Sequence, residues 1–240
     1  MSPAEVPHGA VVVAVDGGRP AAAARAWATA AATKERRPLV VTRSRLPARA
    51  LDSLSARAHL LVIDAGRHGT RAVVVRRSRC PVVVVPDRPA PGRGVVVGVG
   101  GDPGSVATLD FAFRTASWLG ESLTVVHCYQ EAEQMSGHAL VSPPHSDLAG
   151  ERLLVAETLA GLRTGYPEVA VGVRIERGLP EDVLGDLGND AVLVVVGGTR
   201  HGLLTERTIG SVARRLLVRG ACPVAVVPHS RREQPTASGG

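Results

Sequence analysis

The sequence is poor in aromatic residues and in cysteine. Phe, Trp and Tyr make up only 2% of the 240 residues, so few side chains could stack on nucleic-acid bases. The cysteines Cys80, Cys128 and Cys222 are too few for a disulfide framework and lack zinc-finger spacing. We therefore expect three buried free thiols and a reducing compartment.

Long apolar runs and a secretory leader are also missing. Runs such as 82–85 and 95–97 are far shorter than the roughly 20 apolar residues that span a bilayer. Residues 1–9 lack a basic region followed by a long apolar stretch, so no signal peptide is evident. We expect a cytoplasmic protein with no membrane partner.

The charge is basic but dispersed. The formal net charge is +6 and the pI is near 10.2, carried mostly by arginine. Basic chains bind nucleic acids or acidic ligands, but here the arginines occur only as short scattered pairs, so we expect no nucleic-acid partner. The 45% apolar content is enough for a core, which must consist of Val, Leu and Ala.

Valine-rich runs alternate with segments of helical spacing, which predicts a parallel sheet covered on both faces. Strands are expected at 10–15, 39–42, 60–63, 82–85, 94–99, 123–128, 170–175, 191–196 and 223–227. Helices are expected at 20–33, 48–58, 70–77, 105–119, 147–163, 180–187 and 212–218, and a mobile loop at 130–146.

An internal repeat divides the chain. Cys-Pro-Val-Val-Val-Val-Pro at 80–86 matches Cys-Pro-Val-Ala-Val-Val-Pro at 222–228, and an ungapped alignment carries 67–69 onto 200–202. The first copy lacks nine residues before its Cys-Pro and lacks a counterpart of 123–163. The predicted divisions are a disordered lead at 1–9, a degenerate repeat at 10–86, a linker at 87–93, a complete domain at 94–228 and a disordered tail at 229–240.

The stretch from Ala191 to Val218 has the features of an anion site. An apolar strand runs into Gly197 and Gly198, and after a polar loop Gly210 and Ser211 open a helix. The first amides of a helix lack partners within it, and the helix dipole favours negative charge there. The plain alternative is an ordinary strand–helix connection in which the glycines only form a turn.

Several motifs give the chain its resemblance to a tandem universal stress protein with a degenerate, shortened first repeat. They are Val-Val-Val-Gly-Val-Gly-Gly-Asp-Pro-Gly-Ser at 95–105, Val-Val-His at 125–127, Gly-Gly-Thr-Arg-His-Gly at 197–202, Ile-Gly-Ser-Val at 209–212 and Cys-Pro-Val at 222–224. The resemblance implies an α/β fold of two tandem parallel-sheet domains, Rossmann-like and similar to adenine nucleotide alpha-hydrolases. The second domain would be a complete five-stranded sheet with helices on both faces.

The family resemblance also implies a nucleotide site. The family's ATP pattern is Gly, two residues, Gly, nine residues, then Gly-Ser or Gly-Thr. Gly197 and Gly210 fall in register, but Arg200 replaces the middle glycine, and Gly100 stands where the family usually has Asp. The implied cofactor-binding positions are Gly98, Val99, Gly100, Cys128, Val196, Gly197, Arg200, Gly202, Gly210, Ser211 and Val212.

The function implied is a non-enzymatic regulatory protein of stress or dormancy that binds ATP or another adenine nucleotide, alone or with Mg²⁺, in its second domain. The alternative is a nucleotide-free scaffold that acts through an unknown protein partner. A Gly-rich match to dinucleotide sites at 98–104 lacks an acid at the end of the next strand for a ribose hydroxyl. No hydrolase or Walker motif is present, so no catalytic residue or metal site is expected.

The resemblance also implies an assembly. Each half ends in a valine-rich strand, at 82–85 and 223–227, and exposed apolar edges favour pairing. We expect these strands to meet within one chain as a pseudo-dimer, with a homodimer left open.

Overall fold

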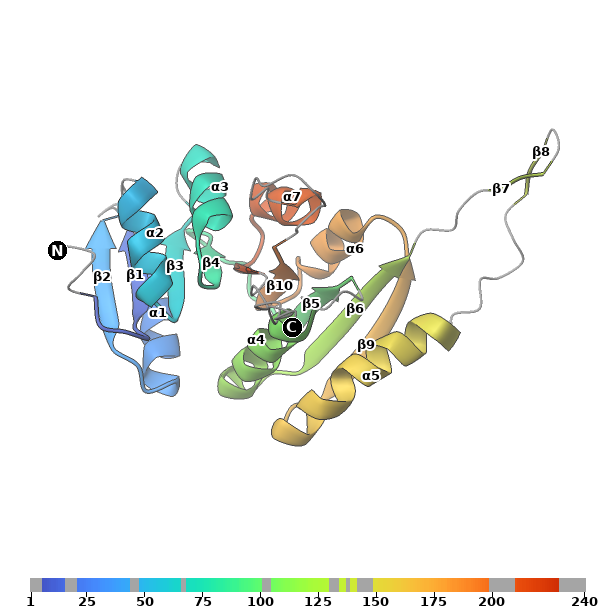
Figure 1. Ribbon diagram of the computed structural model, residues 1–240, viewed down its shortest axis with the longest axis horizontal. Helices are drawn as coiled ribbons and strands as arrows, with labels where there is room; N and C mark the ends of the chain where they lie inside the picture. Colours follow the sequence, from blue (N-terminus) through green and yellow to red (C-terminus); the bar gives the residue numbers. More distant parts are fainter. Residues whose placement is uncertain are drawn as a thin grey trace, which may run out of the picture.

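A computed structural model describes residues 6–15, 21–43, 48–65, 68–100, 105–129, 134–136, 139–141, 149–198 and 210–228 (Figure 1). The strands are β1 Val11–Val15, β2 Leu39–Arg43, β3 Leu60–Asp64, β4 Val82–Val85, β5 Val95–Val99, β6 Leu123–Tyr129, β7 Gln134–Ser136, β8 Ala139–Val141, β9 Val171–Arg177, β10 Leu193–Gly197 and β11 Val224–Val227. The helices are α1 Ala21–Lys34, α2 Ala48–Arg57, α3 His68–Arg77, α4 Ser105–Leu119, α5 Ala149–Gly165, α6 Pro180–Leu187 and α7 Ser211–Arg219.

The two halves share one nine-stranded sheet, in the order β2-β1-β3-β4-β11-β10-β5-β6-β9. Every neighbouring pair is parallel except β4 and β11, which are antiparallel. The predicted meeting of the two final strands within one chain is therefore confirmed. Val83 lies opposite Ala225, and these residues hold equivalent places in the repeated Cys-Pro motif. The halves are thus related by a local twofold axis through this pair.

The alternation of side chains along each strand builds two cores, one on each face of the sheet. Val11 and Val13 face the core that α1, α4 and α5 cover. Val12 and Ala14 face the opposite core, which α2, α3, α6 and α7 cover. Both cores consist mainly of Val, Leu and Ala, as predicted, although Phe113 is the largest fully buried side chain.

The second half contributes all five of its expected strands, in the order β9-β6-β5-β10-β11, whereas the first contributes β2-β1-β3-β4. Strand β2 pairs with β1 as β6 pairs with β5, so β2 is the edge strand of the first half, whereas in the second half one further strand, β9, lies beyond β6. In the described part of the first half, no helix corresponds to α5. Leu39 and Val41 of β2 are accordingly 39% and 46% exposed.

Part of the predicted disordered lead is instead packed against α2. Val6 is buried, and its carbonyl oxygen accepts a hydrogen bond of 3.1 Å from Nε of Arg57. The amide of Gly9 donates to the carbonyl oxygen of Arg57 at 2.8 Å. The prediction of disorder is therefore wrong for residues 6–9, because their backbone is anchored to the end of a helix.

Two other connections also differ from expectation. The predicted linker is tied to the second half, since the amides of Ala90 and Arg93 donate to the carbonyl oxygens of Ala221 and Asp190. Within 130–146, expected to be a loop throughout, β7 and β8 pair as an antiparallel hairpin. None of the described helices is long and apolar enough to cross a membrane.

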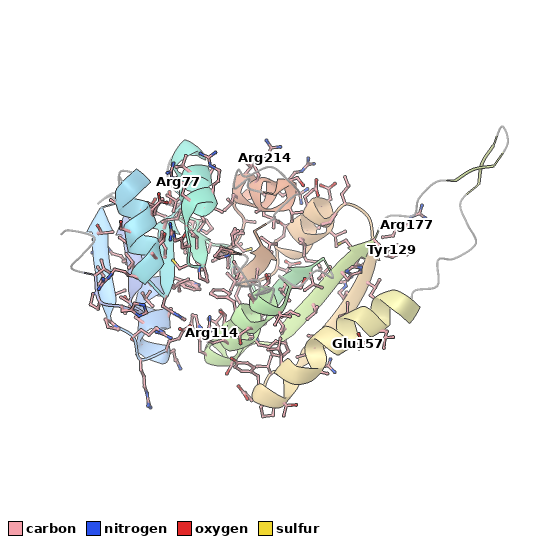
Figure 2. All side chains as sticks on the ribbon, in the orientation of Figure 1. Arg77, Arg114, Tyr129, Glu157, Arg177 and Arg214 are labelled. Carbon is pink, nitrogen blue, oxygen red and sulfur yellow. The ribbon has the colours of Figure 1, made fainter. Side chains whose placement is uncertain are left out.

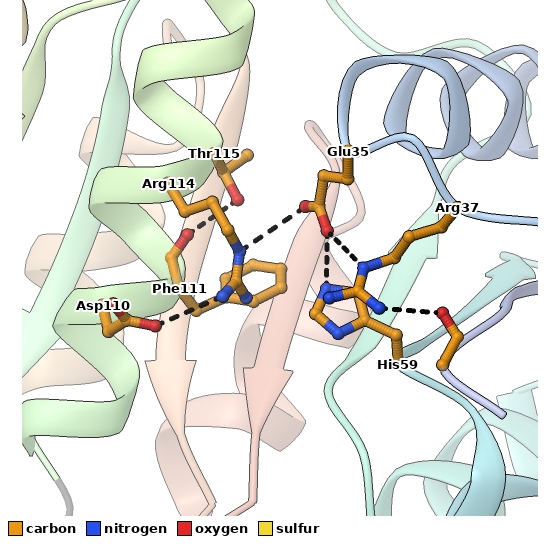
Figure 3. Close-up of polar contacts among 8 residues, drawn as sticks. Glu35, Arg37, His59, Asp110, Phe111, Arg114 and Thr115 are labelled. Atoms are coloured by element: carbon orange, nitrogen blue, oxygen red, sulfur yellow. Dashed lines mark hydrogen bonds and ion pairs between the residues drawn. The ribbon is translucent and has the colours of Figure 1, made fainter.

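Helices α1 and α4 join the halves on one face of the sheet. The rings of Trp27 and Trp118 meet edge to face, with centroids 5.5 Å apart. At the end of α1, the Glu35 side chain is only 8% exposed and accepts from His59 Nε2 at 2.6 Å. Its carboxylate also lies 3.4 Å from Nε of Arg37 and 3.5 Å from Nε of Arg114, which reaches across from α4 (Figure 3).

Candidate functional site

The candidate site lies where the chain direction reverses within the second half. The chain leaves β5, passes through α4 on one face of the sheet and enters β6, which is the neighbour of β5. It leaves β10, passes through α7 on the other face and enters β11, which lies on the opposite side of the β5–β10 pair from β6. The two connections therefore leave the carboxyl ends of β5 and β10 in opposite directions. Ligands in open α/β sheets bind at such switch points.

A cavity of about 170 Å³ occupies this place, and we call it the switch-point cavity. It is lined by residues from β5, β6, β10, α4, α6 and α7, none of which is charged among the described residues. They are Gly98, Val99, Gly100, Ser105, Thr108, Val126, Cys128, Pro180, Leu184, Val196, Gly197, Gly210, Val212 and Ala213.

Most of the positions singled out in the sequence come together here. The lining includes Gly98, Val99, Gly100, Cys128, Val196, Gly197, Gly210 and Val212. Ser211 is the first residue of α7 and is exposed beside the cavity lining. Arg200 and Gly202 lie outside the described residues.

Three helices begin at this cavity: α4 at Ser105, α6 at Pro180, and α7 just after Gly210. At α6 and α7 the N-cap residue makes no side-chain hydrogen bond to the helix. The first turn of α6 carries Glu181 and Asp182, which balance its dipole, whereas the first turns of α4 and α7 carry no acid. The starts of α4 and α7 therefore keep a local preference for an anion.

Gly98 forms part of the cavity floor because it leaves room for a leucine. A Cβ atom at this position would lie 2.6 Å from Cδ1 of Leu184, which projects from α6 and is buried. This close approach requires glycine for space. Gly210 is similarly buried, but its φ of −58° and ψ of 153° are accessible to other residues. Any requirement for glycine there comes from the space at the helix start.

The end of β6 presents one side chain to each face of the sheet. Nδ1 of the buried His127 lies 3.1 Å from the carbonyl oxygen of Val99 and so ties β6 to β5. The next residue, Cys128, faces the cavity. Burial, with the nearby charges of Glu176 and Glu181, raises the pKa of the Cys128 thiol to about 11. The thiol is therefore protonated at neutral pH, which does not suit a nucleophile.

The main lining residues that sequence reasoning missed lie on α4 and α6. Ser105 and Thr108 are buried, and their hydroxyl-bearing side chains lie one helical turn apart on α4. Pro180 and Leu184 have the same relation on α6. Ser105 could have been found as a serine that opens a helix just after a glycine-rich turn. Pro180 and Leu184 could have been found as apolar residues four positions apart at the start of a helix, where Leu179-Pro180 repeats Leu46-Pro47.

Ion pairs hold together the two helices that cover the cavity on one face. Arg219 Nη1 of α7 donates to Oδ1 of Asp186 on α6 at 3.0 Å, and Arg219 Nη2 lies 3.6 Å from Oδ1 of Asp182. The guanidinium lies so close over Gly185 that a Cβ there would meet Nη1. By contrast, Arg214 points outward from α7 (Figure 2).

Within the described ranges, no group of three or more His, Cys, Asp or Glu side chains could hold a metal ion. The cavity therefore offers apolar walls, backbone groups, two hydroxyls and helix starts, which suit binding of a flat, partly apolar anion.

Comparison with known proteins agrees with this fold. A universal stress protein of Mycobacterium tuberculosis is 32% identical over 160 residues, which are 64% of this chain and 50% of the relative. A second one from the same species is 31% identical over 205 residues, 77% of this chain and 66% of the relative. The chain thus spans about half to two thirds of the length of these relatives.

Among solved structures, a universal stress protein from Archaeoglobus fulgidus matches with a TM-score of 0.56 at 16% identity, over 87% of this chain and 80% of that one. One universal stress protein was solved in complex with cAMP (TM-score 0.46, 22% identity, 59% of this chain and all of that one). Another, from Archaeoglobus fulgidus, was solved with dAMP (TM-score 0.39, 20% identity, 56% of this chain and 97% of that one).

The model of the universal stress protein family matches residues 93–228, which is more than half of the 240 residues. This segment contains the five strands of the second half and the whole of the described cavity lining. The chain belongs to the universal stress protein family.

Proposed function

We propose that the switch-point cavity binds ATP or another adenine nucleotide, alone or with Mg²⁺. The protein would then act in stress or dormancy as a non-enzymatic regulator whose state depends on the bound nucleotide. The observation that carries the proposal is an uncharged, largely apolar cavity that meets the uncapped start of α7, where the first turn has no acid. An adenine base suits the first feature and phosphates suit the second.

The size of the cavity supports a division of the ligand between two parts of the site. Whole ligand pockets usually measure roughly 300–1,000 Å³, so the 170 Å³ between β5, β6 and β10 would take the base and part of the ribose. The phosphates would lie at the amides that open α7, beside Ser211. Arg200, outside the described residues, would add positive charge, and any Mg²⁺ would arrive with the phosphates.

The complexes of two other universal stress proteins with cAMP and dAMP are consistent with this ligand class. Gly100 contributes only backbone groups to the lining, so we expect weaker binding than at a site with a side-chain acceptor there. The competing function is the nucleotide-free scaffold that acts through a protein partner.

The experiment that separates these two functions is to denature the purified protein and identify the small molecules released. It is paired with calorimetric titration of ATP into protein stripped of ligand. Released adenine nucleotide, or saturable ATP binding, supports the proposal. A clean supernatant together with no heat of binding would favour the scaffold.

A substitution at Gly210 tests the location of the site. Gly210→Asp places a carboxylate and a Cβ at the buried start of α7, where phosphates are expected, so charge repulsion and loss of space should abolish ATP binding. Gly161→Asp is the matched control, because a Cβ at Gly161 has no neighbour within 4 Å and the position lies on α5. Unchanged ATP affinity in Gly210→Asp would place the site elsewhere.

A further inference from the structure

Strand β9 forms the outer edge of the sheet in the second half, and half of its backbone groups point outward. Among the described strands it is the last in the sheet order, beyond β6 (Figure 1). The carbonyl oxygen of Ala170 and the amide of Gly178 both bond to residues of β6. Because successive residues of a parallel strand direct their N–H and C=O groups to alternate sides, the even-numbered residues face β6. The odd-numbered ones, including Val173 and Ile175, present their N–H and C=O groups to the free edge, where another strand can pair.

On the face of the sheet that α5 covers, the side of β9 is apolar and incompletely filled. A groove of about 480 Å³ lies between α5 and β9. Its described lining is apolar except for Arg163, and it includes Ala156 and Ala160 of α5 and Val173 and Ile175 of β9. Val173 is 42% exposed, although it faces a helix. The groove therefore has room for apolar side chains from a further strand placed beside β9.

The opposite face of β9 carries one cation and one anion, two residues apart. Nε of Arg174 donates to Oε1 of Glu176 at 2.8 Å. Both side chains remain partly exposed, 50% for Arg174 and 34% for Glu176. Each β9 strand thus offers a positive and a negative group side by side next to its free edge.

These charges favour a second β9 strand as the partner, in one register. If two β9 strands pair antiparallel about a twofold axis at Ile175, Arg174 of each copy lies opposite Glu176 of the other. An axis at Arg174 would keep the outward backbone groups paired but would place the two arginines opposite each other. Opposite charges across an antiparallel pair stabilise it and like charges destabilise it, so the axis at Ile175 is favoured.

We infer that a second copy of this chain binds at the β9 edge, by antiparallel pairing of the two strands about Ile175. The outward N–H and C=O groups supply the main-chain hydrogen bonds, and the side chains fix the register. The two Ile175 side chains meet beside α5, and the four charged groups alternate in sign across the junction. The other edge strand, β2, has exposed Leu39 and Val41 but no acidic residue, so it offers no such charge pairing.

Charge reversal tests the register, with sedimentation velocity of the full chain over a concentration series as the measurement. The wild type should dimerise. Arg174→Glu and Glu176→Arg each place like charges opposite each other at two positions, so each should weaken the dimer by about tenfold or more. An equimolar mixture of the two variants should dimerise again. One copy then contributes only acids at 174 and 176 and the other only arginines, so every opposing pair is attractive.

Proline substitution tests the backbone pairing. Val173→Pro removes an outward N–H and should abolish the dimer, while the far-UV circular dichroism stays that of the wild type, since edge strands tolerate proline where the N–H faces solvent. Val41→Pro is the matched control. The carbonyl oxygen of Pro38 bonds to β1, so the N–H of Val41 likewise points outward, but from β2. This variant should remain a dimer.

Three results would overturn the inference. The first is a wild type that stays monomeric at every concentration. The second is a dimer that persists in both charge variants, or a mixture of them that stays monomeric, because either contradicts the register. The third is a dimer lost in Val41→Pro but kept in Val173→Pro, which would place the interface at β2. None of these measurements depends on a nucleotide, so the proposed function stands or fails separately.

Discussion

At the scale of single residues, the site depends on glycines for two different reasons. Gly98 leaves space, since a Cβ there would lie 2.6 Å from Leu184. Gly100 leaves the end of β5 without charge or bulk beside the start of α4. The sequence shows both as glycines of one motif, and only the packing of α6 against β5 separates the steric role from the electrostatic one.

The steric role can be tested by Gly98→Ala. The added methyl group must displace Leu184 from a buried position, so the free energy of unfolding should fall by about 1–3 kcal/mol, the usual cost of overpacking. Urea unfolding with two spectroscopic probes measures this change. Gly172→Ala is the control, because a Cβ at that strand position has no neighbour within 4 Å; it should change stability by no more than about 0.5 kcal/mol. Equal stability of the two variants would show that Leu184 adapts freely.

At the scale of elements, the cavity depends on how α6 and α7 are held together. Both helices line it, and Arg219 joins them through Asp182 and Asp186 while lying over Gly185. These charged groups are substantially exposed, so the pairs add little to global stability. Their main effect is to fix one helix against the other.

Arg219→Ala should therefore lower nucleotide affinity by several fold while leaving the melting temperature nearly unchanged. Of the ion pairs described between the two helices, only that of Arg215 with Asp182 would remain, so their spacing would be less fixed and the apolar wall formed by Leu184 and Ala213 would loosen. Titration calorimetry and thermal unfolding measure the two quantities separately. Arg214→Ala removes the same charge from the outer side of α7 (Figure 2) and serves as the control. An equal loss of affinity in both variants would indicate a general charge effect instead.

Much of the element structure could be predicted because local signals mark it. The bounds of α4 and α6 follow from Ser105 and Pro180 at their first positions, and the valine runs mark the buried strands. The hairpin of β7 and β8 was missed because its strands have only three residues each and lack clear alternation. The packing of residues 6–9 on α2 depends on a tertiary contact between Val6 and Arg57, which no local pattern shows.

The candidate site could be predicted only in part, for a similar reason. Its glycines lie in recognisable motifs after β5 and β10. Leu184 and Ser105, in contrast, come from helices that lie on opposite faces of the sheet. They line the same cavity because those helices begin at the same sheet edge. Their own sequence neighbourhoods predict a core leucine and a helix start.

At the scale of the whole molecule, the two halves are joined by the β4–β11 pair and by the contacts between α1 and α4. Burial alone would raise the pKa of Glu35. The hydrogen bond from His59 and the charges of Arg114 and Arg37 outweigh burial, so the pKa lies below its ordinary value. Glu35 is thus charged in the folded state and binds its three partners as an anion.

This lowered pKa predicts how stability changes with pH. A carboxyl whose pKa is lower when folded stabilises the fold fully above its unfolded-state pKa of about 4.3. The contribution is lost as the pH falls from there through the lower folded-state value. At pH 7, Glu35→Gln should lose about 1.5–3 kcal/mol, the range for hydrogen bonds to charged groups.

The measurement is the difference in unfolding free energy between wild type and Glu35→Gln from pH 7 to pH 3, which cancels the titration of the other carboxyls. The difference should shrink below about pH 4.3. Asp110→Asn is the control, because Asp110 also pairs with Arg114 but is nearly half exposed and should show a much smaller difference. A Glu35→Gln difference that is constant over the whole range would contradict the lowered pKa.

The last prediction concerns stoichiometry: each chain should bind at most one nucleotide, in its second half. The register places Asp64 opposite Val85 and Gly197 opposite Val227, so Asp64 holds in the first half the place of Gly197 in the second. A buried acidic residue there opposes phosphate. The first copy also lacks the nine residues that carry the Gly-Ser helix start, so fewer amides are available to replace phosphate hydration.

Calorimetric titration of ATP should therefore saturate at one equivalent per chain. Asp16→Ala, which removes the first half's acid after β1, should leave the affinity unchanged. Ser211→Ala combined with Arg200→Ala should weaken binding about tenfold or more, since charge-assisted hydrogen bonds contribute about 1.5–3 kcal/mol each. Two equivalents per chain, or a loss of binding in Asp16→Ala alone, would mean that the shortened half has kept a working site despite Asp64.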